Sequence, residues 1–85
     1  MNVKAQIEEI LKREFNPAKL IVRDDSARHA GHAGAQESGG GHFTLEIASA
    51  AFNGLPPVKR HRLIYAALKP LQPQIHALAL KISEV

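Results

Sequence analysis

The chain has 85 residues, of which 45% are apolar and 22% charged, and it contains no cysteine. This composition is typical of one small globular domain, and it excludes disulfides, thiol catalysis and thiolate metal sites built from this chain alone. The formal net charge of +3 permits an anionic partner without requiring one. Five histidines are many for so short a chain, and their role has to be explained.

The first predicted element is an amphipathic helix. Its apolar residues recur at helical spacing: Val3, Ile7, Ile10, Leu11 and Phe15. Asn2 suits the N-cap, and Asn16-Pro17 ends the helix because proline disfavours a helical residue before it. A β-branched run over residues 18–24 then predicts a strand.

Residues 25–41 show no apolar periodicity and contain five of the six glycines. A connection of this length in a compact domain is usually functional or disordered, so we expect a long flexible loop. Phe43, Leu45 and Ile47 then alternate with polar or small residues, which predicts a half-buried strand antiparallel to the first.

The second half of the chain predicts a short turn-like piece over residues 49–55, a helix and a strand. Pro56-Pro57 suits the start of the helix, where proline loses no hydrogen bond, and Pro70 and Pro73 end it. Its predicted apolar side carries Val58, His61, Ile64, Tyr65 and Leu68. Residues 74–83 are apolar on both alternating faces, which predicts a central strand or one covered on both sides.

This order of elements predicts an α+β fold, with helices packed on one small sheet, in a single domain over residues 1–85. The longest apolar runs fall far short of the ~20 residues needed to span a bilayer. The first residues also lack the apolar core of a signal peptide. We therefore expect a cytoplasmic protein without membrane contact.

Catalytic motifs are missing from the sequence. It has no G-x-S-x-G nucleophile elbow and no phosphate-binding G-x-x-x-x-G-K-[ST] loop. Asp24 and Asp25 are paired carboxylates, but adjacent residues on a strand point to opposite faces. We expect a protein that is not an enzyme.

The histidines divide by position. His29 and His32 lie in the glycine-rich loop, either solvated or as two ligands of an incomplete metal site. His76, predicted mid-strand on the face of Leu78 and Leu80, is either a core histidine with a hydrogen-bond partner or a ligand beside the loop. His61 is expected to be structural through a buried hydrogen bond, and His42 has no assigned chemistry.

The helix start carries three cations, Lys59, Arg60 and Arg62. Cations in a first helical turn oppose the helix dipole, at ~0.3–1 kcal/mol each. Two interpretations stay open: these residues contact an anion such as nucleic acid, glutathione or an acidic protein surface, or they form a solvated basic face.

Several motifs together resemble the BolA family. They are Asp24-Asp25-Ser26-x-x-His29, His42-Phe43, Phe52-Asn53-Gly54, Arg60-His61-Arg62-Leu63-Ile64-Tyr65 and Ile75-His76-Ala77-Leu78. They span nearly the whole chain in the expected order, and the combination of the last two is the most specific. The loop sequence His-Ala-Gly-His-Ala-Gly resembles the version found in bacteria and plant organelles.

The resemblance implies a class II KH-like αββααβ fold and a monothiol glutaredoxin as heterodimer partner. In such complexes the two proteins share a bridging [2Fe-2S] cluster, with thiolates from glutaredoxin and glutathione. The BolA side would supply His76 and one loop histidine, His29 or His32, and the isolated chain would hold no cofactor. We expect a role in cluster trafficking or iron and redox regulation.

The alternative function is a DNA-binding transcriptional regulator of stress response and cell morphology. The resemblance implies DNA contact through the basic helix region, here Lys59, Arg60 and Arg62. Cluster ligands and basic residues are different, so both functions can coexist in one chain. Alone, the protein is expected to be a monomer or a weak homodimer.

Overall fold

The first helix, α1 (Val3–Phe15), begins and ends as its local sequence dictates. The Oδ1 atom of Asn2 accepts a hydrogen bond from the backbone N–H of Ala5 at 2.7 Å, which caps the first turn. At the other end, Asn16 adopts the left-handed conformation, with φ 43°, and its N–H bonds back to the carbonyl of Lys12. The computed structural model describes residues 2–25 and 41–85.

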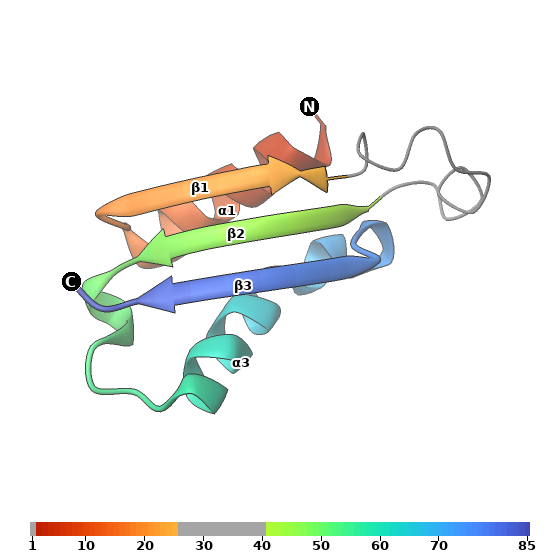
Figure 1. Cartoon of the computed structure of the whole chain (residues 1–85). Helices are drawn as coiled ribbons and strands as arrows, with labels where there is room; N and C mark the ends of the chain where they lie inside the picture. The colour runs from red at the N-terminus through yellow and green to blue at the C-terminus, as the bar shows by residue number, and fades with distance from the viewer. Residues whose placement is uncertain (1, 26–40) are drawn as a thin grey trace.

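Three strands form one mixed sheet in the order β1-β2-β3 (Figure 1). They are β1 (Lys19–Asp24), β2 (His42–Ala48) and β3 (Ala77–Ser83). β1 and β2 are antiparallel, as predicted, with Val22 opposite Leu45. β3 runs parallel to β2, so that His42 stands opposite Ala77 and the two strands start at the same end of the sheet.

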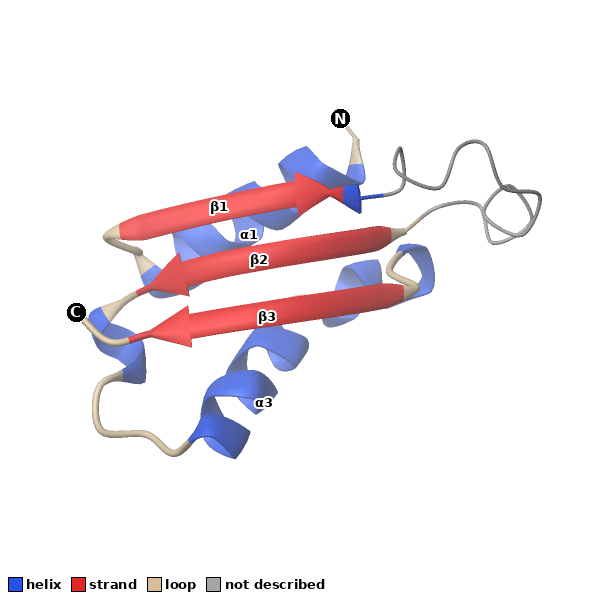
Figure 2. Ribbon diagram, viewed as in Figure 1, coloured by secondary structure: helices blue, strands red, loops and turns tan. Residues whose placement is uncertain are grey.

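Helices cover one face of this sheet (Figure 2). α1 and α3 (Pro57–Ala67) pack there with two 3-10 segments, η2 (Ala50–Phe52) and η3 (Lys69–Gln74). The buried core consists of Ile7, Leu11, Val22, Phe43, Leu45, Ile47, Phe52, Ile64, Leu68 and Leu71. The predicted α+β architecture is confirmed.

Apart from Ile21, the other face of the sheet carries polar and small residues. Across it, Glu46 on the central strand lies 3.5 Å from a guanidinium nitrogen of Arg23 and 3.9 Å from the ammonium of Lys81. Opposite charges on neighbouring strands suit a solvated sheet face, where each such pair contributes little to stability.

The prediction of a central or doubly covered last strand was wrong. β3 is an edge strand, and its residues alternate between exposed and half-buried. Its start is also later than predicted, because Pro70 and Pro73 hold the preceding residues in η3. The small residues Ala77 and Ala79 lie on the exposed face, so their apolar character did not signal burial.

The predicted apolar side of α3 was also partly wrong. Ile64 and Leu68 are buried, but Val58 and Tyr65 are 57% and 52% exposed. His61 is exposed as well, which overturns its predicted role in a buried hydrogen bond. The position one turn before Ile64 on the buried side is taken by Arg60, whose side chain is only 18% exposed.

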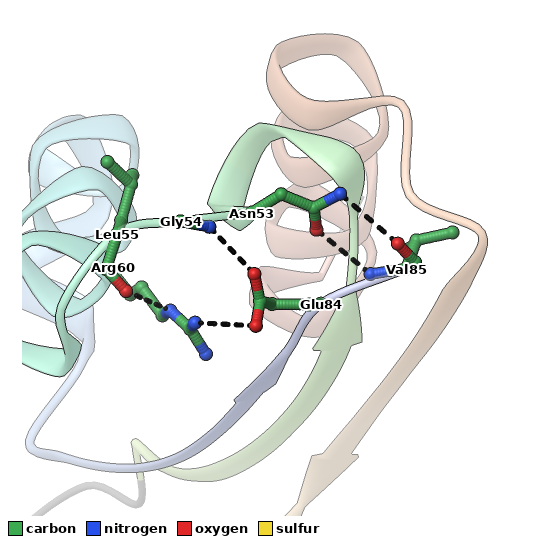
Figure 3. Close-up of polar contacts among 6 residues, drawn as sticks. All are labelled: Asn53, Gly54, Leu55, Arg60, Glu84 and Val85. Carbon is green, nitrogen blue, oxygen red and sulfur yellow. Dashed lines mark hydrogen bonds and ion pairs between the residues drawn. The ribbon is translucent and has the colours of Figure 1, made fainter.

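Arg60 is half-buried, and it ties the start of α3 to the C-terminal end of β3 (Figure 3). Its Nε donates to the carbonyl of Leu55 at 2.7 Å, and a terminal nitrogen lies 3.4 Å from the carboxylate of Glu84. Glu84 also accepts the backbone N–H of Gly54 at 2.7 Å. One carboxylate therefore joins the turn before α3 to the helix itself.

Asn53 completes this corner, because its side chain pairs with the backbone of Val85 in both directions (Figure 3). The N–H of Val85 donates to the amide oxygen at 3.0 Å, and the amide nitrogen donates to the carbonyl of Val85 at 3.1 Å. The Phe-Asn-Gly motif is thus structural: Phe52 is fully buried, Asn53 binds the chain end, and Gly54 takes a positive φ of 77°.

Among the helices described, none is both long enough and apolar enough to cross a membrane.

Candidate functional site

His76 is held by its backbone at the start of β3. Its N–H donates to the carbonyl of Gly41 at 2.7 Å, and the N–H of Ala77 donates to the same oxygen at 3.1 Å. Gly41 has a φ of 82°, and a Cβ atom there would lie 2.6 Å from the carbonyl oxygen of Gln74. Only glycine fits this position. The two hydrogen bonds to the carbonyl of Gly41 then fix the backbone of His76.

The side chain of His76 is exposed, and it is not mid-strand in the core as one interpretation predicted. It lies just before β3, beyond the alternating faces of the strand. The interpretation as a buried core histidine is therefore wrong, and an accessible imidazole on a rigid backbone remains. Such a placement is compatible with metal binding.

His42 lies beside His76, although its sequence context did not suggest any chemistry for it. The ring centroids are 6.0 Å apart and the ring planes are inclined by 42°. The parallel pairing of β2 and β3 brings these two residues together. A connection that contains a helix favours parallel strands, so the signal that could have found the pair is the α3 segment between them.

Two grooves flank this end of the sheet. One, of about 390 Å³, is lined by Tyr65, Ala66, Leu68, Lys69, Gln72, Ile75, His76, Ala77 and Leu78. The other, of about 350 Å³, is lined by Asp25, His42, Phe43, Thr44, Ala77, Leu78 and Ala79. Each groove therefore has one imidazole in its lining, and Ala77 and Leu78 line both grooves.

The loop that carries the other candidate histidines is anchored at this same end. Asp25, the last residue described before the loop, accepts the hydroxyl of Thr44 on β2, and Gly41 ends the loop directly before His42. His29 and His32 lie outside the described residues. Within residues 2–25 and 41–85, no three histidine, aspartate or glutamate side chains are close enough to hold a metal ion together.

The predicted anion-contact residues differ in their surroundings. Lys59 and Arg62 are exposed on α3, whereas Arg60 is engaged by Leu55 and Glu84. The structure thus separates one arginine with an internal role from two exposed cations. Contact of the three with an anion stays a prediction.

The fold and the sequence together define the family. The model of the BolA-like protein family matches residues 11–84. The structure is similar to that of BolA1 from Arabidopsis thaliana, with a TM-score of 0.85, 36% identity, and coverage of 99% of this chain and 93% of that one. The chain belongs to the BolA-like family, as its motifs indicated.

Three named relatives match most of this chain. "SufE-like protein 1, chloroplastic/mitochondrial" of Arabidopsis thaliana is 46% identical over 88% of this chain, which spans 22% of that protein. "Protein BOLA1, chloroplastic" of the same plant is 39% identical over 93% of this chain, which spans 51% of it. "DNA-binding transcriptional regulator BolA" of Escherichia coli is 40% identical over 94% of this chain and 73% of that protein.

Proposed function

We propose that this protein is a non-enzymatic partner of a monothiol glutaredoxin, and that it co-ligates a bridging [2Fe-2S] cluster through His76. The observation that carries the proposal is the exposed His76 imidazole on a backbone fixed by Gly41, beside a groove. The physiological role would be cluster trafficking or iron and redox regulation.

The donors of the described residues fit such a shared site. An imidazole suits iron, and His76 presents one at the anchored end of the loop that carries His29 and His32. The chain has no cysteine, so every thiolate must come from another molecule. A histidine-ligated cluster has a higher reduction potential than one held by thiolates alone.

The surface around His76 also suits a protein partner. On α3, Tyr65 is 52% exposed, and it lines the groove that contains His76 together with the apolar residues Ile75 and Leu78. Lys69 adds a cation to the same groove. An apolar surface with an aromatic side chain and a basic rim is typical of an interface, and it would bring glutaredoxin-bound glutathione, an anion, close to the imidazole.

The test is reconstitution with a monothiol glutaredoxin, iron, sulfide and glutathione, followed by visible absorption and circular dichroism. We expect a spectrum that differs from that of the glutaredoxin homodimer reconstituted alone. Identical spectra with and without this chain would refute the proposal.

The same reconstitution identifies the loop ligand. His29→Ala and His32→Ala are compared in parallel, and only the variant that removes a ligand should change the spectrum. The two variants serve as controls for each other, because each removes one imidazole from the same glycine-rich segment. If neither single variant nor the double variant has an effect, the proposed loop ligand is wrong.

A second candidate function is transcriptional regulation through DNA binding. The Escherichia coli relative, at 40% identity, is named as a DNA-binding transcriptional regulator. In this chain Lys59 and Arg62 are exposed cations on one helix, available for phosphate contacts. We propose these two side chains as the DNA contacts, with Arg60 in a supporting position.

A further inference from the structure

The strongest feature that the cluster proposal leaves unused is the pair of imidazoles at the start of β2 and β3. We propose that His42 and His76 together bind one divalent transition-metal ion of the zinc, nickel and copper class in the isolated chain. The juxtaposition of the two rings, with centroids 6.0 Å apart, carries this inference. Binding of this ion requires no glutaredoxin, iron or sulfide.

The separation of the rings is close to that of a shared ion. Two imidazoles on one tetrahedral zinc ion, with Zn–N distances of about 2.0–2.1 Å, have ring centroids about 5 Å apart. The observed 6.0 Å exceeds this by an amount that rotation of the side chains can close. The rings are also tilted by 42° instead of stacked, so their edges can turn toward a common point.

The backbone that carries both rings is already in place. His42 is the first residue of the central strand, and Ala77 stands opposite it in β3. The residue before His42, Gly41, accepts the N–H of His76. Because β2 holds the backbone of His42 and the bond to Gly41 holds the backbone of His76, both Cα positions are fixed before an ion binds.

The chemistry of the donors decides which ions would bind. Imidazole suits zinc, nickel and copper, whereas calcium and magnesium prefer oxygen ligands. Asp25 lines the same groove as His42, but its carboxylate accepts the hydroxyl of Thr44. The described residues therefore supply two nitrogen ligands, and the flanking grooves leave room for water at the remaining coordination positions.

The test is a zinc titration of the full chain, followed by NMR of the imidazole nitrogens. We expect the signals of His42 and His76 to shift together along one saturable 1:1 curve, while those of His61 on α3 stay in place. The curve should persist in the double variant His29→Gln/His32→Gln, because the site excludes the loop histidines. A His42 signal that does not move with that of His76 would overturn the proposal.

Affinity gives a second readout. Loss of even an outer-sphere partner commonly weakens metal binding by about 10–100-fold, so His42→Gln should weaken zinc binding by at least about tenfold. His61→Gln is the matched control and should leave the affinity unchanged. Equal affinity of His42→Gln and the parent chain would contradict the site. The unmodified chain reports on both rings directly, so the NMR result does not depend on the folding of any variant.

Discussion

The backbone N–H of His76 donates to the carbonyl of Gly41 at 2.7 Å, so the residue that ends the loop also positions the candidate ligand. Gly41 cannot be replaced without cost, because its φ is 82° and a Cβ would lie 2.6 Å from the carbonyl oxygen of Gln74. The loop anchor and the candidate metal ligand are therefore one structural unit.

Gly41→Ala tests this unit. Strain at positive φ together with the close approach of the added methyl group should lower the free energy of unfolding by at least about 2 kcal/mol. The substitution should also change the cluster spectrum of the glutaredoxin complex. Chemical denaturation measures the first effect and circular dichroism the second.

Gly54→Ala is the matched control, because Gly54 also has a positive φ, of 77°, but has no atom within 4 Å of the added methyl group. It should cost about 1–2 kcal/mol from backbone strain alone and leave the spectrum unchanged. Equal effects of the two substitutions on both readouts would show that Gly41 does not position His76.

Arg60 is predicted to stabilise the fold, whereas its neighbour Arg62 is not. Arg60→Met removes a hydrogen bond to Leu55 and the ion pair with Glu84, and should lower the free energy of unfolding by about 1–3 kcal/mol. Arg62→Met, on the exposed side of the same helix, should change it by less than about 0.5 kcal/mol. Urea unfolding measures both free energies. Equal losses for the two variants would refute the stabilising role of Arg60.

Ser49 offers a test of the connection between α1 and η2. Ser49 is 1% exposed; its hydroxyl donates to the carbonyl of Phe15 at 2.6 Å and accepts the N–H of Ala51 at 3.1 Å. Ser49→Ala leaves the carbonyl of Phe15 and the N–H of Ala51 without the Ser49 hydroxyl, and should lower the free energy of unfolding by about 1–3 kcal/mol. Ser83→Ala, at the exposed end of β3, should be nearly neutral, and a comparable loss there would contradict the explanation.

DNA binding by α3 predicts a specific dependence on salt. Neutralising Lys59 and Arg62 with glutamine should weaken binding uniformly across sequences and reduce the slope of log K against log salt by about 1 for each phosphate that the variant no longer neutralises. The double variant Lys12→Gln/Arg13→Gln on α1 removes the same two charges elsewhere and should have little effect. An unchanged slope in the Lys59→Gln/Arg62→Gln variant would remove DNA contact through α3 as a function.

Much of the fold follows from local signals in the sequence. The caps of α1, the alternation of β2 and the proline start of α3 depend on residues close together in the chain, so short-range patterns predicted them. The inward side of α3 does not, because Arg60 is half-buried against Glu84, a residue far along the chain that lies next to it in the fold. The periodicity of apolar residues cannot reveal an arginine on the inward side of a helix.

In the candidate site, likewise, one residue was identified from the sequence and the other was not. His76 was identified from its motif, but its companion His42 is brought to it only by the parallel pairing of β2 and β3. The edge position of β3 likewise depends on strand order, which its own composition does not determine. Residues with small side chains, such as Ala77 and Ala79, fit either a buried or an exposed strand face.

The central claim, that His76 is a cluster ligand, is tested most directly by one substitution in the reconstituted complex. His76→Ala is compared with His61→Ala, which removes an exposed imidazole from α3, and both complexes with a monothiol glutaredoxin are followed by visible circular dichroism. We predict that His76→Ala changes or abolishes the heterodimer spectrum while His61→Ala preserves it. A spectrum that is unchanged by His76→Ala would contradict the account.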